Sequence, residues 1–304
     1  MHSILDAALQ SARPFLSKGK VAAYIPALNR ANPDQLGVAV CLPDGSSFSA
    51  GDAGVGFTIQ SISKVFTLVT AIRSLGRDRV FERVGLEPSG NPFYSLVQLE
   101  YEAGRPRNPF INAGAMAISS LLPGETSSIR LDVVAGGMSE LCGRELSINV
   151  DVYSSERDTG NRNKAVGFFM KHFDIIEGDV TVAVDTYFRS CSIEMTCLEL
   201  ARAGLFLSNH GVDPTSKQRI LEQHDVQWIN SLMTTCGLYD ASGEFACRVG
   251  VPGKSGVGGG ILAIVPGKMS IAAFGPALDE KGNSIGAWKV LEFLSAEMGL
   301  SLYA

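Results

Sequence analysis

Two short segments of this 304-residue chain combine side chains that could carry out acyl transfer. The first is Ser61-Ile62-Ser63-Lys64, in which a hydroxyl and an amine lie three residues apart. On a helix, residues three apart share a face, so both side chains would point the same way. A serine hydroxyl is a poor nucleophile until a base removes its proton, and a neutral lysine can be that base. The tetrad therefore predicts Ser61 as a nucleophile and Lys64 as its general base.

The surroundings of Ser61 separate this tetrad from a chance match. A chain of this length contains a Ser-x-x-Lys about once by chance, and Ser17-Lys18-Gly19-Lys20 is a second match near the end of an expected surface helix. Lys64, by contrast, precedes the nearly continuous apolar run 65–72, and a buried ammonium is costly unless it is paired or neutral. Ser61 would begin this helix, where unpaired backbone N–H groups favour negative charge.

The second segment is Lys254-Ser255-Gly256, which precedes Val257 and three glycines at the start of a probable strand. Glycines after such a segment allow a backbone to approach a ligand closely. A phosphate-binding loop is excluded, because its pattern needs Gly where Arg248 stands. In penicillin-recognising enzymes a Ser-x-x-Lys is joined by a Lys-Thr-Gly. The segment fits that position with Ser in place of Thr. The two motifs together are stronger evidence for an acyl-transfer site than either motif alone.

Further polar residues could line a pocket around these motifs. The hydroxyls of Tyr24, Tyr187 and Tyr239 could relay a proton or bind a carboxylate, although each is equally suited to the core. The stretches 108–115 and 155–163 are rich in amide and charged side chains, which is typical of solvated loops and also of binding loops. The four histidines have no metal-ligand spacing, and neither His224 nor any cysteine has a motif that supports a catalytic role.

The composition favours a water-soluble enzyme of the cytoplasm. The formal net charge of −5 is not concentrated in runs, which argues against nucleic acid and membrane partners. The N-terminus lacks a secretory signal, and no apolar run approaches the roughly 20 residues that cross a bilayer. The six cysteines are scattered without a C-x-x-C, as is usual for free thiols in a reducing compartment.

The hydrophobic patterns predict strands near both ends of the chain and helices between them. Helices are expected over 5–16, over part of 57–75, over 133–141 and 198–208, and after Ser284 as an N-cap. Strands are expected at 37–42, 46–49, 261–265 and 269–274. Helix breaks are expected at Pro88, Pro92, Pro106, Pro109, Pro123 and Pro214.

The simplest assembly of these elements is an α/β fold with one antiparallel sheet, flanked by helices and built from both chain ends. The middle of the chain would then be an inserted all-helical domain. This reading assigns residues 1–66 and 228–304 to the sheet domain and residues 67–227 to the helical domain, with the active site between them.

At the level of whole motifs, the sequence resembles the serine-dependent glutaminases of the bacterial glutaminase A kind. The resemblance covers about residues 19–282 and is carried by six blocks: Lys20–Pro26, Gln60–Lys64, Asn108–Ala115, Ser155–Asn163, Tyr239-Asp240 and Lys254–Gly260. It implies a β-lactamase-like fold and hydrolysis of L-glutamine to L-glutamate and ammonia without a cofactor. It also implies a homo-oligomer, either a dimer or a tetramer.

The resemblance also implies roles for individual residues. Ser61 would be acylated and Lys64 would be its base. For that role the pKa of Lys64 must be lowered, either by burial in its apolar helix or by a nearby cation, which Lys254 could supply. The oxyanion would be held by the backbone N–H groups of Ser61 and Val257. Substrate contacts would come from Tyr24, Ser61, Asn112, Glu156, Asn163, Tyr187, Tyr239 and Val257. The Ser/Tyr-x-Asn motif of penicillin-recognising enzymes is absent at Tyr187-Phe188-Arg189, so the proton relay remains open between Tyr187 and Tyr239.

Two other functions fit parts of this pattern. A penicillin-binding protein or β-lactamase would share the motifs, but such enzymes work outside the cytoplasm and the chain lacks a signal sequence. An amino-acid sensor would keep the pocket without turnover, but the set Ser61, Lys64 and Lys254 is intact.

Overall fold

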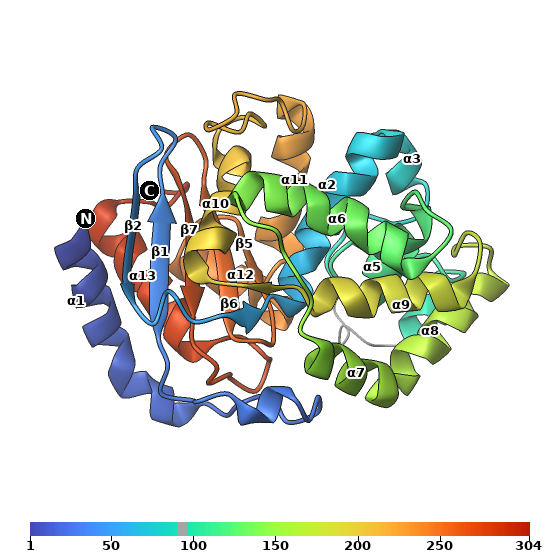
Figure 1. The fold of residues 1–304 in the computed structure, drawn as a ribbon, viewed down its shortest axis with the longest axis horizontal. Coiled ribbons are helices and arrows are strands. Elements are labelled where there is room, and N and C mark those ends of the chain that lie inside the picture. Colours follow the sequence, from blue (N-terminus) through green and yellow to red (C-terminus); the bar gives the residue numbers. More distant parts are fainter. Residues whose placement is uncertain (90–95) are drawn as a thin grey trace.

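The central sheet is built from both ends of the chain (Figure 1). In the computed structural model, which describes residues 1–89 and 96–304, five antiparallel strands lie in the order β2-β1-β7-β6-β5. Their bounds are Gly37–Cys41 (β1), Ser47–Gly51 (β2), Gly253–Ser255 (β5), Gly260–Val265 (β6) and Met269–Phe274 (β7). The expected α/β class and the antiparallel sheet from both chain ends are therefore confirmed.

Burial explains why these strands were recognisable in the sequence. Every residue of β1, β6 and β7 is buried, because helices cover both faces of these inner strands. They accordingly read as continuous apolar runs. Strand β2 lies at the edge, and its residues alternate between exposed and half-buried positions. The register pairs Gly37 with Gly51 and Gly260 with Phe274.

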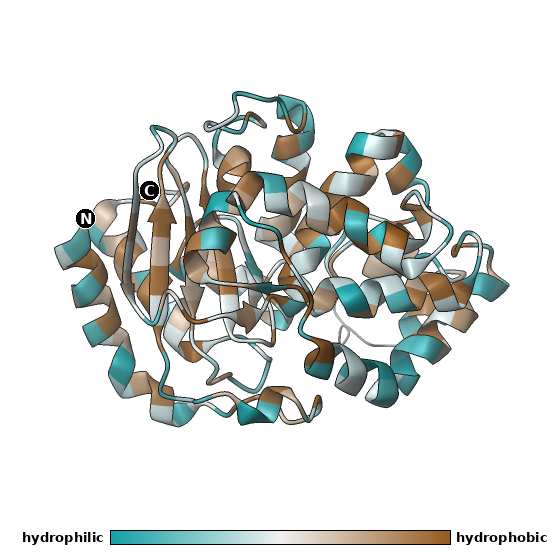
Figure 2. Ribbon diagram, viewed as in Figure 1, coloured by the Kyte–Doolittle hydropathy of each residue, from teal (hydrophilic) through white to brown (hydrophobic). Residues whose placement is uncertain are grey.

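Helices pack on both faces of the sheet. On one face lie α1 (His2–Ala12) and α13 (Ile285–Met298), which contact each other, and on the other lies α10 (Cys197–Ser208). Teal and brown residues alternate along α1 in Figure 2, as expected for a helix with one face in the core. The remaining helices are α2 (Ser63–Leu75), α3 (Arg77–Phe81), α4 (Leu96–Tyr101), α5 (Asn112–Leu121), α6 (Ser127–Cys142), α7 (Val150–Thr159), α8 (Asn161–His172), α9 (Val180–Cys191), α11 (Gln223–Cys236) and α12 (Ser242–Arg248).

Most predicted helices lie where the patterns placed them. The N-terminal α-helix ends at Ala12 and continues as the 3-10 helix Arg13–Lys18, because Pro14 cannot continue the α-helical hydrogen bonds. The last helix begins after Ser284, whose side chain accepts a hydrogen bond from the Ala287 N–H. Pro92, one of the expected breaks, lies outside the described residues. Within the described ranges, no helix combines the length and the apolar composition needed to cross a bilayer.

Helix α2 is enclosed by other helices, as its apolar sequence predicted. It packs against α5, α6 and α9, and nine of its residues are buried: Ser63, Lys64, Val65, Phe66, Thr67, Leu68, Val69, Ala71 and Ile72. One hydrophobic cluster continues from these helices to the sheet residues Ala39 and Phe274. The division at residues 66/67 and 227/228 stays a prediction.

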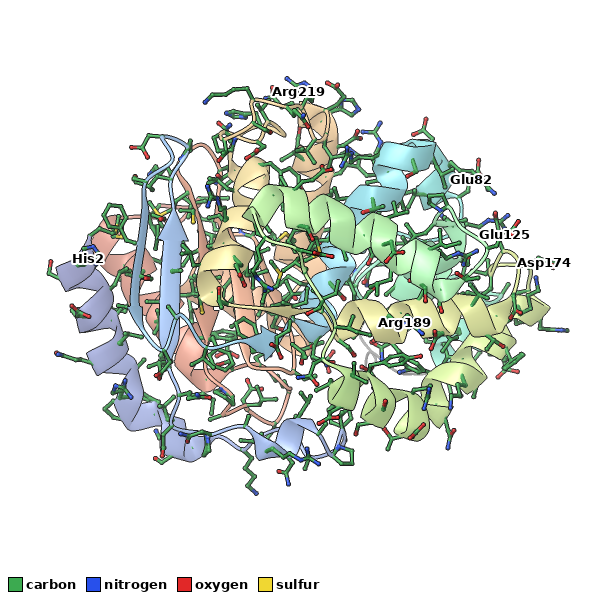
Figure 3. All side chains as sticks on the ribbon, in the orientation of Figure 1. His2, Glu82, Glu125, Asp174, Arg189 and Arg219 are labelled. Atoms are coloured by element: carbon green, nitrogen blue, oxygen red, sulfur yellow. The ribbon has the colours of Figure 1, made fainter. Side chains whose placement is uncertain are left out.

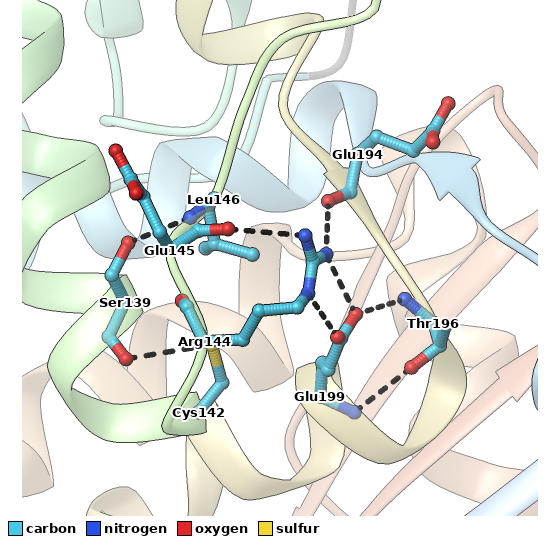
Figure 4. Close-up of polar contacts among 8 residues, drawn as sticks. All are labelled: Ser139, Cys142, Arg144, Glu145, Leu146, Glu194, Thr196 and Glu199. Atoms are coloured by element: carbon cyan, nitrogen blue, oxygen red, sulfur yellow. Dashed lines mark hydrogen bonds and ion pairs between the residues drawn. The ribbon is translucent and has the colours of Figure 1, made fainter.

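A second, two-stranded sheet leads into α2 and was not expected from the sequence. Strand β3 (Phe57–Thr58) pairs with β4 (Glu194–Met195), which lies between α9 and α10. Arg144, just after α6, binds the Glu199 carboxylate at the start of α10 and donates a hydrogen bond to the Glu194 carbonyl (3.3 Å; Figure 4). Thr196 and Glu199 form a capping box in the same cluster. These contacts hold β4 in place. Because β4 pairs with β3, they also hold the strand that precedes Ser61.

Two glycines allow the turn after β5 to lie against the backbone that precedes Ser61. A Cβ at Gly256 would lie 2.3 Å from the Ile59 carbonyl oxygen, and one at Gly258 would lie 2.1 Å from the Thr58 carbonyl oxygen. Since no larger residue fits at these distances, the glycine-rich sequence is what brings Val257 next to Ser61.

A matched pair of glycine substitutions tests this close approach. We expect Gly256→Ala to lower the free energy of unfolding by about 1–3 kcal/mol, because its Cβ would overlap a backbone oxygen. Gly243→Ala in α12 has no atom within 4 Å of the new Cβ and should change stability by less than about 1 kcal/mol. Urea denaturation measures both, and equal stability of the two variants would contradict the proposed packing.

Candidate active site

A cavity of about 240 Å³ lies where the sheet meets the helices. Eight of the predicted site residues line it: Tyr24, Ser61, Asn112, Glu156, Asn163, Tyr187, Tyr239 and Val257. They come from segments that span more than 230 positions of the chain. The two predicted lysines, Lys64 and Lys254, are not part of the lining, and both are buried.

Ser61 lies in the short 3-10 helix Gln60–Ile62, between β3 and α2. The preceding residue, Gln60, has a φ of +48°, which is unfavourable for a residue with a side chain and is typical of functional turns. Among the described residues, neither the Ser61 N–H nor the Val257 N–H donates a hydrogen bond to the protein. Both residues line the cavity, so two backbone donors are available there.

The Lys64 amine is buried, and both of its hydrogen-bond partners are neutral groups. Its side chain is 1 % exposed, and Nζ donates hydrogen bonds to the Phe110 carbonyl (3.1 Å) and to Asn112 Oδ1 (2.7 Å). Burial lowers the pKa of Lys64 to about 8, while interactions with Cys191 and Glu156 act in the opposite direction. A substantial fraction of this amine is therefore neutral in mildly alkaline solution.

Lys254 lies on the other side of the site and is also buried. Its Nζ donates hydrogen bonds to the carbonyls of Gly237 (2.9 Å) and Ser255 (2.6 Å) and lies 4.7 Å from the centre of the Tyr239 ring. Burial and the charge of Lys64 lower the pKa of Lys254 well below its ordinary value. Of the two causes expected for the lowered pKa of Lys64, burial is the main one, and Lys254 is not among the charges that shift this pKa.

The three tyrosines differ in their surroundings. Tyr187 on α9 is buried, its ring centre lies 5.6 Å from Lys64 Nζ, and burial raises its pKa well above the ordinary value. Burial also raises the pKa of Tyr239, whereas the neighbouring side chains of Ser61 and Ser255 oppose this shift. Tyr24 lines the mouth of the cavity, and 62 % of it is exposed.

Two asparagines form a pair beside Lys64. Asn112, the first residue of α5, directs its Oδ1 to Lys64, and its Nδ2 donates a hydrogen bond to Asn163 Oδ1 (3.1 Å) on α8. This arrangement fixes the rotation of the Asn112 amide, since a flipped amide would direct its NH₂ group at the lysine. The Asn163 Nδ2 has no hydrogen-bond partner in the described part of the chain, and Asn163 lines the cavity.

Glu156 provides a buried carboxylate at the cavity. It lies on α7, is 6 % exposed, and its Oε2 has no hydrogen-bond partner among the described residues. Burial raises the pKa of Glu156 to about 8, against the opposing effect of Lys64. An unpaired buried carboxylate is costly, so this oxygen is suited to receive a cationic ligand.

Other charged side chains lie away from the cavity. Glu82, Glu125 and Asp174 lie at the outer edge of the molecule in Figure 3, and the imidazole of His224 is mostly exposed and contacts Asp225. In the described ranges, no cluster of three His, Cys, Asp or Glu side chains could hold a metal ion.

The cavity has five lining residues that the sequence reasoning did not single out: Ile25, Gln60, Thr159, Gly160 and Arg162. All of them lie in the resembling blocks, within three residues of a predicted site residue. The signal that could have found them was therefore proximity in sequence, since neither periodicity nor charge distinguishes these positions.

Comparison with known proteins identifies the family. A family model described as Glutaminase matches residues 19–303. The chain is 46% identical to glutaminases of Clostridium botulinum (strain Hall) and Clostridium tetani over 305 residues, covering all of each chain.

Solved structures agree in fold. A Bacillus glutaminase determined in the presence of sodium chloride has 38% identity and a TM-score of 0.91 over 98% of each chain. A Bacillus subtilis glutaminase in covalent complex with 5-oxo-L-norleucine, formed by reaction with 6-diazo-5-oxo-L-norleucine, has 37% identity and a TM-score of 0.88 over 98% of each chain. The chain therefore belongs to the serine-dependent glutaminase family.

Proposed function

We propose that this protein hydrolyses L-glutamine to L-glutamate and ammonia through a glutamyl ester on Ser61, with Lys64 as the general base. The observation that carries this proposal is the burial of the Lys64 amine among neutral acceptors, in the helix that follows Ser61. A lysine in bulk water is protonated at neutral pH and cannot accept a proton. The buried amine has a lowered pKa and can do so.

The hydrogen bonds of Lys64 support its role as a base. A neutral amine has two N–H groups and one lone pair. The Phe110 carbonyl and Asn112 Oδ1 accept the two N–H groups, so the lone pair is left for a third direction. Ser61 precedes Lys64 by three residues, and we assign the lone pair to its hydroxyl.

The reaction then proceeds in two halves. Ser61 Oγ attacks the side-chain amide carbon of glutamine, and its proton passes to Lys64. The proton then passes from Lys64 to the amide nitrogen as the C–N bond breaks, so ammonia leaves, an ester remains on Ser61 and Lys64 is neutral again. A water molecule then gives a proton to the base while its oxygen attacks the ester carbon, which releases glutamate and restores the hydroxyl.

Two further features would stabilise the transition states. The unbonded N–H groups of Ser61 and Val257 would hold the developing oxyanion, and one such donor is typically worth about 3 kcal/mol. We assign the proton relay to the leaving nitrogen to Tyr239, because Tyr239 and Ser61 line the same cavity and Ser61 opposes the rise in the pKa of Tyr239. The Tyr187 ring lies beside the Lys64 amine, and the Lys254 amine lies beside the Tyr239 ring and donates a hydrogen bond to the Ser255 carbonyl.

The polar lining suits a zwitterionic amino acid. The unpartnered Oε2 of Glu156 would bind the α-ammonium group, and the Asn163 Nδ2 and the Tyr24 hydroxyl would donate to the α-carboxylate. The glutamine analogue bound covalently to a relative supports this class of ligand. We further propose a homo-oligomer, a dimer or tetramer, in the cytoplasm, where free thiols such as the six cysteines here are usual.

Removal of the nucleophile tests the chemical step. We expect Ser61→Ala to lower ammonia release by at least about 1,000-fold without loss of folding, and to abolish the mass increase that 6-diazo-5-oxo-L-norleucine produces on the intact wild-type protein. Ser17→Ala, in the exposed second Ser-x-x-Lys, is the matched control and should behave as wild type. Normal turnover or labelling of Ser61→Ala would reject Ser61 as the nucleophile.

Neutralising Glu156 tests recognition of the ammonium group. Glu156→Gln should raise the KM for glutamine roughly 10- to 100-fold, since a hydrogen bond to a charged group contributes about 1.5–3 kcal/mol, with a smaller change in kcat. In the wild type, KM should fall as pH rises through about 8, because the carboxyl of Glu156 becomes ionised there. Steady-state kinetics measure both effects.

The exposed Glu125 gives the matched substitution for this test. Glu125→Gln should keep the wild-type KM. A Glu156→Gln variant whose KM equals that of Glu125→Gln would remove Glu156 from the substrate site.

A further inference from the structure

The segment 108–115 contains two asparagines, and the proposed function uses only Asn112. Asn108 is 1 % exposed and does not line the cavity. Its Oδ1 accepts hydrogen bonds from the Phe110 N–H (3.0 Å) and the Ile111 N–H (3.1 Å), and its Nδ2 donates to the Glu87 carbonyl (2.9 Å). Both ends of the amide are thus used inside the protein, and neither is directed at a ligand.

The turn that Asn108 organises supplies both acceptors of the Lys64 amine. The Phe110 carbonyl lies two residues after Asn108, and Asn112 begins α5 immediately after the turn. An asparagine followed by proline is typical of such turns, because its side chain bonds the backbone two and three residues on. The two accepted hydrogen bonds therefore fix the peptide units that connect these acceptors.

The next turn of α5 is packed against the same residue. A Cβ at Gly114 would lie 2.0 Å from the Asn108 carbonyl oxygen, so the helix touches the backbone of the turn directly. On the other side, the Nδ2 bond joins the turn to the segment that contains Glu87, where the Glu87 N–H also donates to the Arg107 carbonyl (3.0 Å). Asn108 therefore contacts both neighbours, α5 through its backbone carbonyl and the Glu87 segment through its side-chain amide.

We propose that Asn108 is a positioning residue for the general base: its amide holds the turn that presents the Phe110 carbonyl and the Asn112 amide to Lys64. The inference rests on the proposed function, since it assumes that Lys64 deprotonates Ser61. Asn108 acts only through Lys64 and touches no substrate. Its loss should leave ligand binding in place and misdirect the amine, and displacements of about 1 Å in a catalytic group can cost roughly 100-fold in rate.

The test is a comparison of kcat and KM in variants of the complete chain. Asn108→Ala should lower kcat roughly 10- to 100-fold and leave the KM for glutamine within about threefold. Asn108→Ser should recover part of the lost kcat, because a serine hydroxyl can accept the same backbone N–H groups. If Asn108→Ala does not fold, a lowered kcat at unchanged KM in Asn108→Ser is the deciding result.

Two control variants are needed. One shows what a loss of stability alone does to kcat, and the other tests whether Lys64 is the base. Asn230→Ala removes another buried asparagine, which donates to the Leu207 carbonyl outside the active-site cavity. It should destabilise the protein in urea and leave kcat unchanged. Lys64→Ala should lose most of kcat, and if it does not, the proposed base is wrong. If Lys64→Ala is inactive while folded Asn108→Ala and Asn108→Ser have wild-type kcat, the positioning role of Asn108 is overturned.

Discussion

The site depends on one physical constraint: an amine is enclosed in the hydrophobic core and has only neutral groups as hydrogen-bond partners. Burying a charged ammonium costs several kcal/mol even after relaxation, so the surroundings of Lys64 lower its pKa and shift its equilibrium toward the neutral form. Helix α2 provides these surroundings, because other helices enclose it. The apolar residues that follow Lys64 therefore stabilise the fold and also lower the pKa of the base.

The rest of the molecule brings distant segments to this amine. The sheet built from both chain ends carries the turn with Val257, and glycines at 256 and 258 let that turn touch the backbone before Ser61. The helices of the middle segment supply Asn112, Glu156 and Tyr187. Arg144 holds β4 through its hydrogen bond to the Glu194 carbonyl, and β4 in turn pairs with β3, the strand that leads to Ser61. The cavity thus forms only when both parts of the chain are folded together.

Much of this arrangement could be predicted from the sequence, and the failures have physical reasons. The inner strands and α2 were recognisable because burial on all sides produces continuous apolar runs. The strands β3 and β4 have two residues each, too few to show any periodicity. For the lowered Lys64 pKa the sequence left burial and the charge of Lys254 as alternatives, because spacing does not show which charged groups come close in the fold. Asn108 lies 44 positions from Lys64, and its role follows only from tertiary contacts.

The most direct measurement is an NMR titration of the wild-type protein with lysines labelled with ¹³C at the ε-carbon. The resonance of Lys64 is assigned by its absence in Lys64→Ala, and the ¹³C shift is followed from about pH 6 to about pH 11. The account predicts a midpoint at a pKa of about 8. A midpoint near the ordinary lysine value of about 10.4 would contradict it, because the amine would then be protonated when catalysis requires a base.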